Sequence, residues 1–322
     1  MHTYRRITYE DRCQIHALRK AGITQAEIGK VLGVSQGTVS RELSRNTGQR
    51  GYHFQQAQRT AQSRQAQVRH KPRKLTRRVR RAITRKLRVE RWSPEQISFW
   101  LRDACGISLS HEWIYRMVWD DKHAGGALWR FLRRRGKKYN RRGAPHAGRG
   151  VIPHRVDIAE RPAIVNSKSR LGDWEGDTIV GAQHNGALLT HVERKSLFTT
   201  ISKLVRPTAK ATHRATVHRL IPLRDYVHTI TYDNGKEFAG HRKTAHLLHA
   251  QVFFATPYHA WERGVNENTN GLIRDFFPKG TDFTTIHPAT VAKVERLLNR
   301  RPRKSLGFKT PNEVFHALAK RG

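Results

Sequence analysis

Short runs of β-forming residues dominate the chain beyond about residue 165 and limit the class of fold it can adopt. Three of them, "WEGDTIVGA", "ALLTHVER" and "LFTTISKLV", follow one another across the turn-sized gaps "QHNG" and "KS", a pattern that predicts an antiparallel meander. Helical and β-rich segments then alternate as "ATHRATVHRLI", "VHTITYD", "EFAGHRKTAHLLHA" and "QVFFATPY". We therefore expect a mixed α/β sheet covered by helices.

The first part of the chain is predicted to be helical, with a helix-turn-helix at residues 24–45. Thr24 and Glu27 fit a capping box, Gly33 supplies a tight turn, and Ser35 can cap the second helix. The outward side of that helix carries residue types that contact base edges and phosphates: Gln36, Thr38, Ser40, Arg41, Ser44 and Arg45. An ordinary helical hairpin with a solvated face is the alternative, and the basic composition favours DNA binding.

A second helix-turn-helix-like unit is predicted in "WSPEQISFWLRDACGISLSHEWIYRMVW", residues 92–119. Ser93 and Gln96 fit another capping box, and Ser110 can cap the following helix. Tryptophans usually fill a core or an interface, so packing is the alternative to DNA contact for three residues of this unit: Trp100, Trp113 and Trp119.

These patterns divide the chain of 322 residues into four expected parts. Residues 1–70 form a helix-turn-helix DNA-binding domain, and residues 71–132 form a second helical domain. A basic linker follows at 133–164, where "RRRGKKYNRRGAPHAGRG" either tracks a phosphate backbone or serves as a hinge. The α/β domain occupies residues 165–322.

The charge balance points to nucleic acid as the partner. The chain has 62 Lys and Arg against 25 Asp and Glu, a net charge of +37, and repels itself unless a polyanion is near. A membrane surface and a basic ribosomal-type tail are the alternatives. The sequence has no run near the roughly 18 apolar residues of a spanning helix and no signal-peptide-like start. Its two cysteines, Cys13 and Cys105, exclude a disulfide framework and fit a reducing cytoplasm.

Three carboxylates lie at or near strand ends and a helix start, where the catalytic residues of α/β sheets commonly lie. Asp177 is inside the first strand, Asp233 ends the strand "TITYD", and Glu267 is near the start of a later helix. Two or three carboxylates suffice for Mg²⁺ in phosphoryl transfer. Asp233 could instead be a turn residue and Glu267 a first-turn acid on the helix dipole. Asp173 and Glu175 share the face of Asp177 if the strand is regular.

Several longer motifs carry a family resemblance. "GDWEGDTIVG", "TYDNGKEFAGH" and "PYHAWERGVNENTNGLIRDFFPKGTDF" resemble the insertion-sequence-thirty (IS30-like) family of bacterial transposases, within the DDE transposase and retroviral integrase superfamily. The segments "ITYEDRCQIHALRKAGITQAEIGKVLGVSQGTVSREL", "WSPEQISFWL" and "RPRKSLGFKTPNEVF" are similar to other parts of that family, so the resemblance covers almost the whole chain. Between Asp233 and Glu267 lie 33 residues.

The resemblance implies a ribonuclease-H-like catalytic domain in which Asp177, Asp233 and Glu267 are catalytic and bind Mg²⁺, with Mn²⁺ as a possible substitute. It places Asn270 and Arg274 against DNA. It further implies a transposase that binds the terminal inverted repeats of its element, acts on target DNA in the cytoplasm at the nucleoid, and works as a homodimer or higher synaptic oligomer. A non-enzymatic helix-turn-helix regulator and a ribonuclease-H-like nuclease are the alternative functions.

Overall fold

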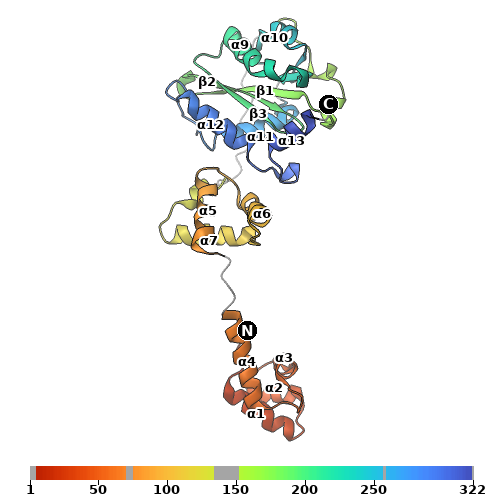
Figure 1. Ribbon diagram of the computed structural model, residues 1–322, viewed down its shortest axis with the longest axis vertical. Coiled ribbons are helices and arrows are strands. Elements are labelled where there is room, and N and C mark those ends of the chain that lie inside the picture. The colour runs from red at the N-terminus through yellow and green to blue at the C-terminus, as the bar shows by residue number, and fades with distance from the viewer. Residues whose placement is uncertain (1–4, 70–74, 134–151, 257–258, 321–322) are drawn as a thin grey trace. The chain divides into compact units, whose positions relative to one another are not determined.

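The computed structural model describes residues 5–69, 75–133, 152–256 and 259–320 (Figure 1). The chain forms two compact units, Met1–Arg73 and Lys74–Gly322. Among the described residues, no helix is long and apolar enough to cross a membrane.

The first unit is a small helical domain with its own core. It consists of α1 (Tyr9–Lys20), α2 (Gln25–Leu32), α3 (Gln36–Asn46) and α4 (Phe54–Arg69). The predicted capping box of Thr24 and Glu27 is confirmed, and Gly33 ends α2 in the left-handed conformation at φ 64°. Ser35 stands at the N-cap of α3, but the capping prediction is wrong: its hydroxyl lies 3.0 Å from Thr38 Oγ1 and bonds no backbone amide of α3. The core is formed by Ile15, Ile28, Leu32, Val39 and Leu43.

The second unit begins with a three-helix module made of α5 (Arg77–Arg88), α6 (Pro94–Cys105) and α7 (His111–His123), followed by the 3₁₀ turn η1 (Leu128–Phe131). The Ser93–Gln96 capping box is confirmed, whereas Ser110 makes no side-chain cap. Trp100 packs against the module's core as expected. Trp113 and Trp119 do not: their exposed fractions are 51% and 41%.

A five-stranded mixed sheet forms the centre of the remaining chain. Its strands are β1 (Asp173–Val180), β2 (Ala187–Glu193), β3 (Thr199–Leu204), β4 (Thr229–Tyr232) and β5 (Gln251–Phe254). They lie in the order β3-β2-β1-β4-β5. The first three are antiparallel neighbours, as the sequence predicts, and β4 and β5 run parallel to β1.

Helices cover both faces of this sheet (Figure 1). On one face α9 (Ala209–Leu220) and α10 (His241–Leu248) bury Leu220 and Leu248 in a core with Trp174. On the other face α11 (Gly264–Ile273) and α12 (Pro288–Asn299) pack over Ile179 and Leu188. The chain ends in α13 (Pro311–Ala319). Because alternate strand residues face opposite ways, Asp177 shares the α11 side with Ile179.

Shorter turns connect these elements. They are η2 (Ile158–Glu160), α8 (Ile164–Ser167), η3 (Ala182–His184), η4 (Ile221–Tyr226), η5 (Lys236–Phe238), η6 (Ala260–Arg263) and η7 (Lys304–Leu306).

The predicted linker at 133–164 extends too far toward the C-terminus. Ile152 is buried in the core around Trp174. The amide of Phe254 donates to the Val156 carbonyl at 2.9 Å, and Asp157 forms a parallel bridge with Phe254. These residues therefore belong to the sheet domain, because they add backbone pairing to the edge strand β5. Residues 134–151, the middle of the predicted linker, lie outside the described residues.

Candidate active site

The register of two parallel strands aligns the first two predicted carboxylates. In β1 and β4, Asp173 pairs with Thr229 and Glu175 pairs with Thr231. Two further residues along, the same register sets Asp177 opposite Asp233, which directly follows β4. Both carboxylates therefore reach the same edge of the sheet, where parallel strands end and sites commonly form.

Asp177 lies in a mostly buried position with defined partners. Its Oδ1 accepts the Thr178 amide at 2.9 Å, and its Oδ2 accepts Asn270 Nδ2 at 2.9 Å. The pKa of Asp177 is raised to about 6, mainly by burial; Arg263 opposes the rise and the nearby Asp233 adds to it. A carboxyl group whose pKa is raised in this way is stabilised in its ionised form by a cation beside it.

Arg263 supplies such a cation and was missed by the sequence analysis. Its Nη1 lies 3.5 Å from Asp177 Oδ2, and its Nη2 lies 3.9 Å from Asp233 Oδ2. One guanidinium therefore spans the two acids. The donor set around it consists of carboxylate oxygens, the ligands that Mg²⁺ prefers. The residues present therefore fit a divalent cation shared between Asp177 and Asp233.

Glu267 is exposed on α11, on the side of the helix that turns toward Asp177. It lies one helical turn after Arg263 and nearly one turn before Asn270, and both of those residues contact Asp177. In the described part of the chain, however, no three acidic, histidine or cysteine side chains are arranged to hold a metal. The structure thus aligns Asp177 with Asp233 and places Glu267 on the helix whose Asn270 contacts Asp177.

The two other acids of β1 serve the fold. Asp173 accepts a two-pronged bond from Arg170, at 3.0 and 2.9 Å, and a bond from Thr229. Glu175 is buried beside Arg194, at 3.4 Å, and accepts the amide of Asn266 at 2.8 Å. Burial raises the pKa of Glu175. Both acids lie on the α11 side of β1, as the alternation predicts, but each is held by an arginine.

A hydrogen-bond chain fixes α11 against the sheet. The hydroxyl of Thr190, which pairs with Asp177 across β1 and β2, lies 3.2 Å from Asn266 Oδ1 and from Asn270 Oδ1. Asn270 therefore reaches Asp177 as an orienting residue. Arg274 is half-buried, and its guanidinium donates to the carbonyls of Val180 at 3.0 Å and Pro278 at 3.4 Å.

Glu237 is a further acid beside the site that the sequence analysis did not single out. Its Oε1 accepts the hydroxyl of Thr178 at 2.6 Å, and its charge contributes to the raised pKa of Asp177. The motif "TYDNGKEF" contains it four residues after Asp233, so a search for acids near strand ends could have found it.

The predicted base-reading side of α3 is open to solvent. Exposed residues there are Gln36, Ser40, Arg41, Ser44 and Arg45, whereas Thr38 is half-buried. Arg41 donates from Nε to the Gly37 carbonyl at 3.0 Å, which leaves the outer part of its guanidinium directed away from that bond. The helix can therefore present these side chains to a DNA groove.

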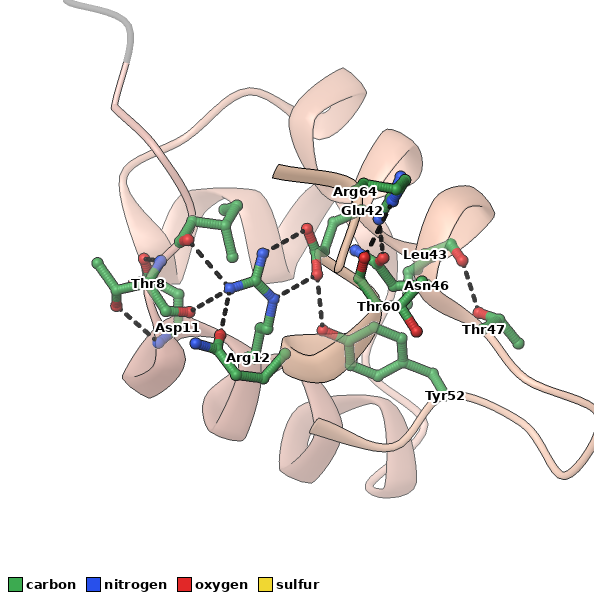
Figure 2. A network of polar contacts seen from close by, with 12 residues as sticks. Thr8, Asp11, Arg12, Glu42, Leu43, Asn46, Thr47, Tyr52, Thr60 and Arg64 are labelled. Atoms are coloured by element: carbon green, nitrogen blue, oxygen red, sulfur yellow. Dashed lines mark hydrogen bonds and ion pairs between the residues drawn. The ribbon is translucent and has the colours of Figure 1, made fainter. Parts of the chain in front are cut away.

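A buried ion pair anchors α3 from behind (Figure 2). Arg12 on α1 donates to both oxygens of Glu42 on α3, at 2.8 and 3.2 Å, and to Gln58 on α4 at 2.7 Å. Tyr52 donates its hydroxyl to Glu42 at 3.3 Å. Since Arg12 and Glu42 are both buried, this network couples the position of α3 to the helices on either side of it.

Comparisons with known proteins agree on one class of protein. A helix-turn-helix domain family model matches residues 3–46. The chain is 45% identical over 314 residues to the transposase for insertion sequence element IS4351 of Bacteroides fragilis, a match that covers 97% of this chain and 96% of the relative. It is 33% identical over 321 residues to transposase InsI for insertion sequence element IS30A of Escherichia coli (strain K12), covering 96% of this chain and 83% of the relative.

Among solved structures, the sheet domain is similar to the catalytic core domain of BIV integrase, with 20% identity and a TM-score of 0.37 over 46% of this chain and 96% of that one. The HTLV-2 integrase catalytic core domain in complex with magnesium matches at 20% identity and a TM-score of 0.37, over 46% of this chain and 97% of that one. The strand order described above, rather than these scores, defines the fold as ribonuclease-H-like.

Proposed function

Because this chain belongs to the IS30 family of transposases, we propose that Asp177, Asp233 and Glu267 form the metal site at which it cuts and joins DNA strands. The chain is a DNA transposase, an enzyme of the polynucleotidyl-transferase type. The observation that carries the proposal is the alignment of Asp177 with Asp233 under one guanidinium, with Glu267 on the neighbouring helix.

Mg²⁺ is the cation proposed for this site, with Mn²⁺ as a substitute. When bound, such ions stabilise the charge that develops on the attacking and leaving oxygens of a phosphodiester. Asp177 and Asp233 would hold them from the sheet and Glu267 from α11. Asn270 orients the Asp177 carboxylate through its 2.9 Å bond, and the charge of Arg263 opposes the rise in the pKa of Asp177.

The reaction proceeds in two displacements at phosphorus. Water attacks the phosphodiester at the end of the element, the P–O bond to the 3′ oxygen breaks, and a 3′-hydroxyl is released. That hydroxyl then attacks a phosphodiester of the target, so that a new P–O bond forms while a P–O bond of the target strand breaks. The number of phosphodiesters is conserved in the second step, so it requires no ATP and no covalent protein intermediate.

DNA recognition is assigned to α3 of the first unit, through the exposed residues that the sequence predicts: Gln36, Thr38, Ser40, Arg41, Ser44 and Arg45. The terminal inverted repeats of the element are the proposed specific site. Asn270 and Arg274 are the proposed DNA contacts beside the metal site. Both ends of an element must be joined in one event, which requires a homodimer or a larger synaptic assembly.

A strand-joining assay tests this function. The full-length protein is incubated with a labelled duplex that carries the element's end, a supercoiled target plasmid, and Mg²⁺ or Mn²⁺. We expect the label to become covalently attached to the plasmid. A simple nuclease would shorten the duplex without labelling the plasmid, and a DNA-binding regulator would do neither, so either outcome contradicts the proposal.

A further inference from the structure

A cavity of about 820 Å³ lies within the second unit, away from the paired aspartates. Its volume falls within the roughly 300–1,000 Å³ that is typical of small-molecule sites. The three-helix module and η1 form one wall, and α11 with the segment after α12 forms the other. Two chemical classes of side chain stand out among those that line it: the aromatic residues Tyr115, Trp119 and Trp129, and the arginines Arg133, Arg301 and Arg303.

Specific polar contacts join the two walls. Gln96 at the start of α6 donates to the Pro302 carbonyl at 2.5 Å and accepts from Arg301 Nε at 3.0 Å. Arg133 donates to Asn268 Oδ1 on α11 at 2.7 Å. The cavity is therefore built by defined side chains.

Two of the arginines are buried with unused donors. Arg301 and Arg303 are 4% and 6% exposed, and within the described residues Arg301 Nη1 and Arg303 Nε have no hydrogen-bond partner. Burial lowers the pKa of Arg301 to about 10 and that of Arg303 to about 9. At Arg301, Asp275 opposes this shift and Arg133 adds to it; at Arg303, the charges of Arg301 and Arg133 both add to it. Buried donors left unpaired are costly. Both arginines line the cavity, where their guanidinium groups favour an anion such as a phosphate.

The aromatic wall offers partly exposed rings, with Lys122 Nζ 5.1 Å from the centroid of the Trp119 ring. Tyr115 and Trp119 are spaced four residues apart on α7, so they share one face of that helix, and they are 39% and 41% exposed. Large exposed aromatic side chains next to cationic side chains are the combination that proteins use to stack the bases of single-stranded nucleic acid. The cavity therefore offers cationic side chains for a phosphate and aromatic rings for a base.

The cavity adjoins the proposed active site through α11. Asn268 lines the cavity and directly follows Glu267, a step of about 100° around the helix. Glu267 thus lies between the side of α11 that reaches Asp177 and the side that faces the cavity. The proposed metal site and the cavity therefore share α11 as a common wall.

We propose that this cavity binds one unpaired nucleotide of a DNA strand end, with its phosphate on Arg301 and Arg303 and its base against Trp119 and Tyr115. The proposal rests on the proposed function in taking DNA as the ligand. Holding an unpaired nucleotide there separates the strand end from its complement close to Glu267.

The test compares two labelled duplexes with the full-length protein in EDTA, so that no strand is cut. One duplex carries a short unpaired extension at the element's end and the other is blunt. We expect the extended duplex to bind about tenfold more tightly, the scale of one stacked base. Trp119→Ala should remove that advantage. Trp113→Ala, which changes a more exposed tryptophan of α7 outside the cavity lining, should keep it.

Two further measurements test the proposal without relying on Trp119→Ala alone. Arg303→Gln, which removes one of the two proposed phosphate contacts, should reduce the slope of log affinity against log salt for the extended duplex by about one unit. In the unmodified protein, a 2-aminopurine placed in the extension should lose fluorescence on binding as it stacks. Equal affinity for both duplexes, an equal loss in Trp113→Ala and Trp119→Ala, or an unquenched 2-aminopurine would overturn the proposal. A protein that shows the advantage but does not join strands would contradict the proposed function and leave this assignment standing.

Discussion

At the scale of single residues, burial shifts the pKa of a histidine in the sheet domain. His191 on β2 is fully buried, with its Nε2 3.3 Å from both the Tyr232 hydroxyl and the Thr216 hydroxyl. Burial, with a smaller contribution from the charge of Arg219, lowers its pKa from 6.5 to about 3. His191 is therefore a neutral hydrogen-bonding group that ties β2 to β4 and α9.

This depressed pKa predicts a loss of stability in acid. Between about pH 3 and 6.5 the unfolded chain binds a proton that the folded chain excludes, so the free energy of unfolding rises with pH across that window. His191 contributes at most about 1.4 kcal/mol per pH unit. Urea unfolding followed through the buried Trp174 should show this slope, and His191→Gln should flatten it. An unchanged slope in His191→Gln would assign the acid sensitivity to other groups.

Contacts between distant residues were the least accessible to sequence analysis. Asp177 and Asp233 could be predicted, because an acid inside a β-rich run and an acid at a strand end are local signals. Arg263 could not, because its role arises only when β1, β4 and the start of α11 meet. The assignments of Asp177, Asp233 and Glu267 as metal ligands stay predictions.

At the scale of elements, the strands and helices were predicted well because their patterns are local. The antiparallel meander and the two capping boxes at Thr24 and Ser93 are confirmed. The caps expected from Ser35 and Ser110 are wrong, because a hydroxyl at the N-cap position can take another rotamer. The linker end near residue 164 was misplaced because the pairing of Asp157 with β5 spans about a hundred residues of sequence.

The recognition helix α3 depends on the ion pair behind it. Arg12→Met leaves Glu42 buried without its main partner, so we expect the free energy of unfolding of the fragment 1–73 to fall by about 3–5 kcal/mol. Arg5→Met removes an ion pair with Asp11 in which Arg5 is 51% exposed, and should cost less than about 1 kcal/mol. Denaturant unfolding of both variants measures the difference. Equal small losses would show that α3 is held by its apolar core alone.

At the scale of the whole molecule, the positive charge is spread over both units and predicts an extended DNA contact. Each phosphate neutralised adds close to one unit to the slope of log affinity against log salt. We expect the full chain on a long duplex to show a slope greater than about three in magnitude, and fragment 1–73 a shallower one. Fluorescence anisotropy over a salt series measures both. Equal slopes would confine DNA binding to the first unit.

The central claim is that Asp177, Asp233 and Glu267 act as one metal site, and Glu267→Gln tests it most directly. The change keeps the size of an exposed side chain and removes its charge, so folding and inverted-repeat binding by α3 should be unaffected. Asp177→Asn and Asp233→Asn serve as parallel variants, and Glu175→Gln, a buried acid paired with Arg194, serves as the contrast for structural loss.

The measurement is cleavage and strand joining by each variant in Mg²⁺ or Mn²⁺, beside its affinity for the inverted repeat. We predict that Glu267→Gln loses at least about a thousandfold in both reactions, as do the aspartate variants. Pairs of these changes should be scarcely worse than single ones, because the residues serve one site. Activity that survives in Glu267→Gln, with DNA binding intact, would contradict the account.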